Sequence, residues 1–245
     1  MKKIIYTILV LCLYAGSSVQ VFAQDDDERR WKRRSHGSWH HIALDIGTNN
    51  YLLDGKFPDV NNEPFAVRPW GSWYLAIKSV TDTHLGGPFH LLYGADVSWY
   101  NFKFENENII INRTDEGVEF VERTDGLDVR KSKFSSAYLD VSLVPVINFT
   151  RHRHHFSDGL KFGVGGYAGY RLLTYSRYVF KEDGDKRDVK DKNNFFMNNI
   201  RYGIRSVLGV GSANIFFNYD LNELFADNRG PELNAFSIGL TLHLD

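Results

Sequence analysis

Histidine is the residue type in this sequence that first suggests chemistry. The run "RHRHH" at 151–155 places three histidines and two arginines in five residues, and His41, His90 and His243 lie elsewhere in the chain. Histidine is a transition-metal ligand, a proton-sensitive switch and the general base that a serine nucleophile requires. The run alone is compatible with a metal site, a nucleic-acid patch or a polar turn. Its place along the chain has to decide among them.

A second set of candidate residues consists of charged side chains that recur within otherwise apolar segments. Carboxylates and bases in such positions either perform acid–base chemistry or pair with one another. We predict that they pair as staples inside a barrel and are not catalysts. The set comprises Asp45, Lys78, Asp96, Asp140, Lys161, Arg171, Arg201, Arg205 and Asp220.

The elements that must position these residues are strands with a two-residue period. Eight segments of about ten residues alternate between apolar and polar side chains, which is typical of a transmembrane β-barrel. In "HHIALDIG", for example, Ile42, Leu44 and Ile46 share one face, while His41 and Asp45 share the other. The eight segments are 40–47, 71–79, 89–100, 135–145, 161–172, 199–210, 214–221 and 234–244.

The connections between these segments sort by parity. The first, third, fifth and seventh are long, and those between them are shorter, as expected for extracellular loops and periplasmic turns of a barrel. The expected connections are 48–69, 80–88, 104–132, 148–160, 174–195, 210–213 and 222–232. An even number of strands then places both ends of the barrel in the periplasm.

Aromatic residues gather where strands meet the long connections. We expect them to form a girdle at the membrane interface, where amphipathic rings are enriched. The predicted girdle residues are Trp70, Trp73, Trp99, Tyr100, Tyr175 and Phe195.

The beginning of the chain carries an export signal. Lys2 and Lys3 precede an apolar run from Ile4 to Ala15, and Val21-Phe22-Ala23 resembles a cleavage site, so we expect a signal peptide at 1–23. Residues 24–38 are expected to be a charged, flexible periplasmic tail, and 39–245 the barrel domain. Removal of 1–23 takes two lysines from a formal charge of −1 and leaves −3, which argues against a nucleic-acid partner. The only cysteine, Cys12, lies in the signal, so no thiol chemistry is expected.

Three stretches resemble a known family. "KSKFSSAYLDVSLVPV" (131–146), "FGVGGYAGYRL" (162–172) and "FSIGLTLHL" (236–244) are similar to the outer-membrane β-barrel proteins of PorT-like type. The resemblance covers nearly all of 39–245 and implies an eight-stranded outer-membrane barrel. It implies no particular activity, because such barrels serve many functions.

This topology gives the histidines a location. All nine fall in the tail, at periplasmic strand ends or in periplasmic turns, so a histidine-based lipase site near the outer leaflet is disfavoured. His41, His90 and His243 point inward at similar depth and are the candidates for a metal site or a proton-sensitive latch. Hydrogen bonding of these side chains to inward carboxylates is the simpler interpretation. The run at 151–155 becomes a periplasmic turn.

The sequence therefore predicts an all-β protein, an eight-stranded antiparallel up-and-down transmembrane β-barrel in the outer membrane. We expect a monomer without enzymatic activity or cofactor. Its expected partners are outer-membrane lipid and an extracellular or periplasmic protein. Its expected role is membrane anchor, surface-interaction module or assembly component. Two alternatives stay open: an outer-membrane barrel enzyme acting on lipid or surface substrates, and a soluble periplasmic calycin-like ligand-binding barrel.

Overall fold

The fold is that of a single closed β-barrel, seen in a computed structural model that describes residues 37–123, 128–149, 159–182, 185–210 and 213–244. The expected signal peptide at 1–23, nearly all of the expected tail and the histidine run at 151–155 lie outside these residues. Ser38, expected at the end of the tail, already belongs to the first strand. No helix in the described part of the chain is long and apolar enough to cross a membrane.

Eight antiparallel strands form a closed ring, which confirms the predicted fold class. Going round the ring, each strand pairs with the next, and β1 pairs with β11 to close it. The ring strands are β1 (Ser38–Leu53), β2 (Trp73–Gly86), β3 (Phe89–Lys103), β6 (Asp128–Asn148), β7 (Leu160–Glu182), β9 (Ile200–Val210), β10 (Ala213–Asp220) and β11 (Leu233–Leu244).

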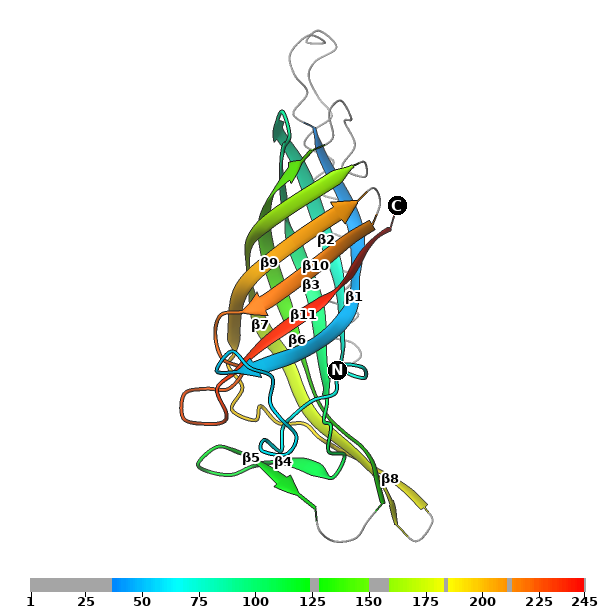
Figure 1. The fold of residues 1–245 in the computed structure, drawn as a ribbon, viewed down its shortest axis with the longest axis vertical. Coiled ribbons are helices and arrows are strands. Elements are labelled where there is room, and N and C mark those ends of the chain that lie inside the picture. Colours follow the sequence, from blue (N-terminus) through cyan, green and yellow to red (C-terminus); the bar gives the residue numbers. More distant parts are fainter. Residues whose placement is uncertain (1–36, 124–127, 150–158, 183–184, 211–212, 245) are drawn as a thin grey trace.

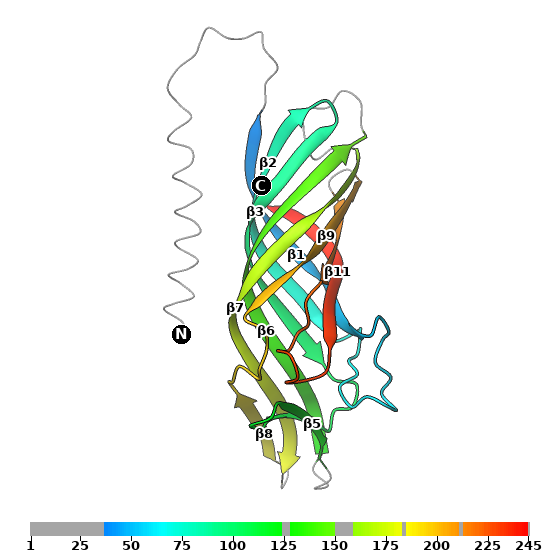
Figure 2. The same cartoon turned by 90° about the vertical axis from the view of Figure 1, so that its left-hand side faces the viewer.

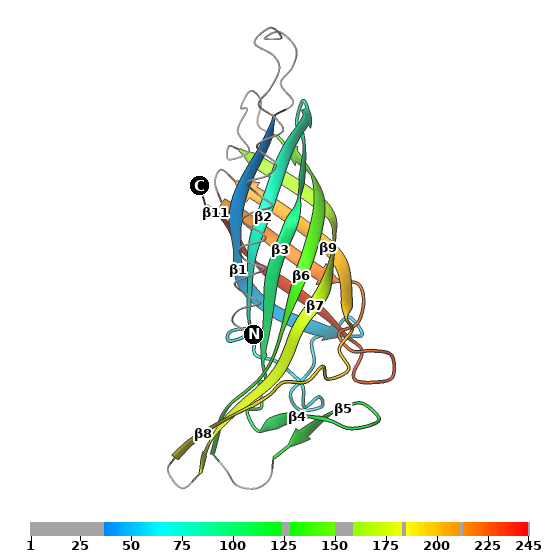
Figure 3. The same ribbon diagram turned by 180° about the vertical axis from the view of Figure 1, so that it is seen from behind.

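The two ends of the barrel differ (Figure 1). At one end, here the turn end, β1 begins and β11 ends, and β2 turns tightly into β3 through Gly86 and Gly87, both with positive φ. At the other, the loop end, the long connections gather, and β6 and β7 continue beyond the ring as a two-stranded ribbon (Figures 2 and 3). Strand β8 (Asp185–Asp191) pairs with the end of β7 and widens this ribbon.

The connection between β3 and β6 contains a separate small sheet. Strands β4 (Ile109–Arg113) and β5 (Val118–Glu122) pair only with each other among the described strands, and they lie across the loop end of the ring (Figure 1).

The outer surface of the ring is apolar. Along each ring strand the outward positions carry large hydrophobic side chains, which remain exposed because no other part of the described chain covers them. Val141 on β6, for example, is 58% exposed. An exposed apolar surface that continues round a whole barrel is a lipid-facing surface, because in water it would promote aggregation. This apolar belt includes Ile46, Ile77, Leu139, Val141, Leu143, Val164, Leu172, Ile204, Leu208, Ile215, Phe217, Ile238, Leu240 and Leu242.

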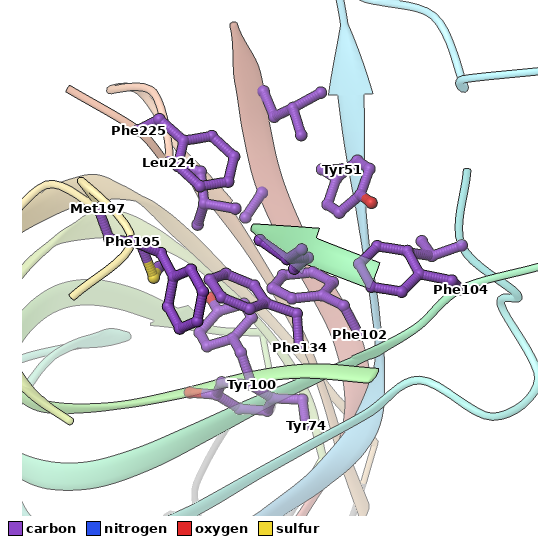
Figure 4. Packing of buried hydrophobic residues seen from close by; sticks show 14 of the residues in the cluster. Tyr51, Tyr74, Tyr100, Phe102, Phe104, Phe134, Phe195, Met197, Leu224 and Phe225 are labelled. Carbon is purple, nitrogen blue, oxygen red and sulfur yellow. The ribbon is translucent and has the colours of Figure 1, made fainter. Parts of the chain in front are cut away.

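The loop end of the lumen is filled by an aromatic plug, which consists of the buried Tyr51, Phe102, Phe104, Phe134, Phe195 and Phe225 (Figure 4). The rings of Phe134 and Phe195 meet edge to face at a centroid distance of 5.5 Å, as aromatic pairs prefer. The small sheet contributes the buried Ile109 and Val118 to the same cluster. Side chains of strands and long loops thus form one apolar core that covers the lumen.

Candidate functional site: a stapled lumen beneath an aromatic plug

The first part of the lumen network centres on Asp45 of β1, which is fully buried. Its carboxylate accepts a hydrogen bond from the Arg205 guanidinium at 2.8 Å, and the Lys78 ammonium lies 3.5 Å away. Lys78 also donates to Asp96 at 2.6 Å, so it bridges two carboxylates. Thr241 of β11 donates to the second oxygen of Asp45 at 2.6 Å. These contacts tie together side chains from β1, β2, β3, β9 and β11.

The second part centres on Arg201 of β9. Its guanidinium donates to both oxygens of Asp140 on β6, at 2.9 and 2.6 Å, and to Ser98 of β3 at 2.9 Å. Ser98 in turn donates to Asp140 at 2.6 Å. The same guanidinium lies over the rings of Tyr100 and Tyr138, at 4.6 and 4.3 Å from their centroids, a favourable cation–π geometry.

A third contact lies beside these two centres. Tyr167 of β7 donates a hydrogen bond to Asp220 of β10. Two further strands, β7 and β10, thus contribute groups to the lumen.

The staples occupy the space that a pore would need. The cavity among Asp96, Asp140 and Arg201 measures about 10 Å³, and the one nearer the turn end about 40 Å³. Spaces of this size hold roughly one water and a few waters respectively. An eight-stranded barrel leaves an interior that side chains just fill. The arrangement therefore crosslinks the wall and leaves no room for an organic substrate among these groups.

The remaining two predicted network residues lie apart from the staples. Lys161 is fully buried near the turn end, where its stem lies close to Gly209. Arg171 lies near the loop end and is partly exposed. It donates to Thr174, to the carbonyl of Asn198 and to the side chain of Asn199, and so fixes the segment that leads into β9.

The three candidate metal ligands do not form one cluster. His41 and His243 meet edge to face with ring centroids 4.7 Å apart, across the seam between β1 and β11. His90 instead contacts Asp82 at 3.0 Å, and its ring lies tilted against that of His84 at a centroid distance of 4.9 Å. Within the described ranges, no group of three histidine, cysteine or acidic side chains is arranged to hold a metal ion. The run at 151–155 is outside those ranges.

The predicted aromatic girdle is partly wrong. Trp70 is 94% exposed and Trp73 is also exposed, while Trp99 and Tyr175 are partly exposed. Tyr100 and Phe195, in contrast, point into the barrel and are almost fully buried. Tyr100 shares the inward face of Asp96 and Ser98, and Phe195 belongs to the plug.

The plug is the feature that sequence reasoning missed. Its residues from the ring could have been found, because Phe102 and Phe134 stand at inward positions of β3 and β6 by the same two-residue period. Those from the loops, such as Phe225, follow no period and carried no signal.

A closed eight-stranded ring with an apolar exterior and a polar, ion-paired interior defines the class of transmembrane β-barrels. No protein-family model matches the chain, and no curated protein matches it. Two solved structures align with it, both of Ail, the attachment invasion locus protein of Yersinia pestis. The first has a TM-score of 0.35 at 13% identity and covers 85% of this chain and 98% of Ail. The second, a complex of Ail with the heparin analogue sucrose octasulfate, has a TM-score of 0.33 at 12% identity with the same coverage. Likeness at this level carries no argument about function.

Proposed function

We propose that this protein is a monomeric, non-enzymatic outer-membrane β-barrel that anchors a surface platform formed by its loop end. The observation that carries the proposal is the combination of an apolar exterior with a lumen that is stapled in the middle and plugged at the loop end. Such a barrel holds its loops in place but does not conduct solutes.

The loop end supports the platform role. The ribbon of β6, β7 and β8 and the small β4–β5 sheet stand beyond the apolar belt, where rigid elements can present side chains to a partner (Figure 3). Arg113 of β4 donates to Asn193 at 2.8 Å, and Arg229 donates to the carbonyl of Asp115 at 2.7 Å. These contacts join three of the long loops into one body.

The position of the histidines supports a non-enzymatic role. The five histidines that the structure describes, His40, His41, His84, His90 and His243, lie at the turn end of the barrel. A serine nucleophile near the loop end that relied on a histidine base would need that base within hydrogen-bond reach, and none of these five histidines lies there. We also propose kinship with the PorT-like barrels, on the three sequence stretches quoted above, and export to the outer membrane by the signal at 1–23.

The lipid-facing role of the belt is tested by a pair of matched substitutions. Val141→Lys places a charge on the belt, and Val121→Lys places a charge on β5. The two valines are similarly exposed, Val141 at 58% and Val121 at 41%. A lysine at mid-membrane costs about 2–4 kcal/mol, falling to about 0–1 kcal/mol near the interface. We expect Val141→Lys to reduce the fraction that folds into phospholipid vesicles, and Val121→Lys to leave it unchanged. Folding is measured as the difference in gel mobility between unboiled and boiled samples.

Cell fractionation provides the second measurement. Wild-type protein should sediment with the outer membrane and be released by detergent. Recovery in the soluble periplasmic fraction, or equal vesicle insertion of the two lysine variants, would refute the proposal in favour of a soluble barrel.

A further inference from the structure

A row of four basic residues crosses the outer surface of the ribbon. Lys103 of β3 stands opposite Lys133 of β6, Lys133 stands opposite Arg177 of β7, and Arg177 stands opposite Lys190 of β8. We call these four residues the basic rung. With strands about 4.8 Å apart, it extends over about 14 Å.

Three rung side chains, Lys103, Arg177 and Lys190, reach the surface beside the lipid-facing belt, whereas Lys133 between them is only 8% exposed. Lys133 has the same parity on β6 as Leu139 and Val141 of the apolar belt. The next row toward the belt contains the exposed Trp73 and the partly exposed Tyr175, with the buried Asn101 and Ser135 between them. Since tryptophan and tyrosine mark the membrane interface, the rung lies at the height where lipid headgroups begin.

Such a row is unfavourable in the absence of a ligand. Like charges directly opposite each other on neighbouring strands destabilise a sheet, and the rung contains three such pairs in succession. Lysines often protect an edge strand from pairing with other chains, which accounts for Lys190 on β8. It does not account for Lys133, which stands between Lys103 of β3 and Arg177 of β7.

Neighbouring acids neutralise only part of the positive charge of the basic rung. Glu107 lies 3.1 Å from the Lys103 ammonium, and Asp188 accepts from Arg177 at 2.9 Å. Lys133 instead donates to the neutral amide of Asn101 at 2.8 Å, and Lys190 lies over the Tyr175 ring at 3.6 Å.

The environment of Lys133 shows the strain of this arrangement. Burial, followed by the charges of Lys131, Arg177 and Lys190, lowers the pKa of Lys133 to about 8. An anion placed against the rung would relieve the repulsion that these neighbours exert.

We propose that the basic rung binds the phosphate groups of anionic lipid headgroups in the leaflet at the loop end. Lysine and arginine form charge-assisted hydrogen bonds with phosphate oxygens. The row offers three such donors that reach the surface, Lys103, Arg177 and Lys190, and the buried Lys133 adds its charge between them. The inference rests on the proposed function, because it requires the belt to lie in a bilayer.

The test uses the full barrel in detergent micelles, with lipid retention measured by native mass spectrometry. The probes are phosphatidic acid and phosphatidylcholine with identical acyl chains. The rung variant is Lys103→Gln/Lys133→Gln/Lys190→Gln, and the control variant is Lys56→Gln/Arg187→Gln/Lys192→Gln, which removes the same charge from positions off the rung. We expect wild type and control to retain phosphatidic acid, and the rung variant to bind it about a hundredfold more weakly.

Each sample is first checked for the unboiled gel shift, so that loss of the barrel itself, which would defeat the proposed function, is seen separately. The single variant Lys190→Gln changes an exposed side chain and avoids any effect on folding. It should weaken binding about fivefold. Three results would overturn the proposal: equal binding of phosphatidic acid by the rung variant and wild type, equal binding of phosphatidylcholine and phosphatidic acid by wild type, or full displacement of phosphatidic acid by an equal concentration of inorganic phosphate.

Discussion

The contact between Arg201 and Asp140 should be among the most sensitive points of the barrel. Both side chains are nearly fully buried, at 4% and 2% exposure, and they share two direct hydrogen bonds and Ser98. Replacement of Arg201 by leucine leaves the Asp140 carboxylate in the lumen with only the Ser98 hydroxyl as a donor from this group. An uncompensated buried charge of this kind costs about 3–5 kcal/mol.

The comparison pair is Arg177 and Asp188 on the ribbon, which form a bidentate contact but are 37% and 41% exposed. A solvent-exposed pair contributes about 0–1 kcal/mol. We therefore expect Arg201→Leu to lower the free energy of unfolding several times more than Arg177→Leu. The double variant Arg201→Leu/Asp140→Leu should be more stable than either of its single variants, because no charge is left without a partner.

The assay is urea unfolding of the barrel in detergent micelles, followed by tryptophan fluorescence and by the unboiled gel shift. The reasoning is refuted if Arg201→Leu costs less than about 1 kcal/mol, the value of an exposed pair. It is also refuted if the effects of Arg201→Leu and Asp140→Leu simply add. Either result would mean that water reaches the pair and replaces the lost contacts.

Three more measurements probe other parts of the molecule. Phe225→Ala should lower the free energy of unfolding by about 3–5 kcal/mol, because it opens a cavity in the plug, and an unchanged urea midpoint would contradict this. Gly239→Ala should cost about 1–3 kcal/mol, since its new methyl group would lie 2.1 Å from the carbonyl oxygen of Ile46 across the closing seam. The outward Gly166→Ala, whose methyl group would have its nearest neighbour at 3.7 Å, is the control and should unfold at the wild-type midpoint. The pKa of Lys133 lies at about 8 in the fold and at 10.5 in the ordinary lysine, so the unfolded chain binds more protons between these values and stability should rise with pH there. This slope should disappear in Lys133→Gln, as measured by urea unfolding at pH 8 and 10.

The strands and their faces could be predicted because the two-residue period directly reports burial. In β1, Asp45 is inward and Ile46 outward, as the alternation indicates. The period does not indicate which inward side chains pair with one another. That Arg201 meets Asp140 and Arg205 meets Asp45 depends on how the strands are staggered round the ring, which eight separate segments do not encode.

The loop strands were harder to predict, because burial leaves no two-residue period in a strand such as β8. Strand β8 reads "DKRDVKD" and has a single apolar residue, Val189, so burial leaves no pattern in it. Backbone pairing with β7 and the contact between Arg177 and Asp188 hold it in place. Strands β4 and β5 lie within the connection expected at 104–132 and form a separate sheet, because the apolar Ile109 and Ile111 of β4 pack in the same buried cluster as the plug.

The pairing of β1 with β11 makes closure of the barrel a late event in folding. Its register joins Ile42 to Leu244 and Leu53 to Leu233, so every hydrogen bond of this seam links residues some 200 positions apart in the chain. Until β11 arrives, β1 and β10 are open edges, and unpaired backbone groups are very costly in a lipid interior. Partly synthesised chains therefore have no stable inserted form. Insertion has to wait for the whole of β11, and a chaperone or assembly machine would have to shield the waiting edges.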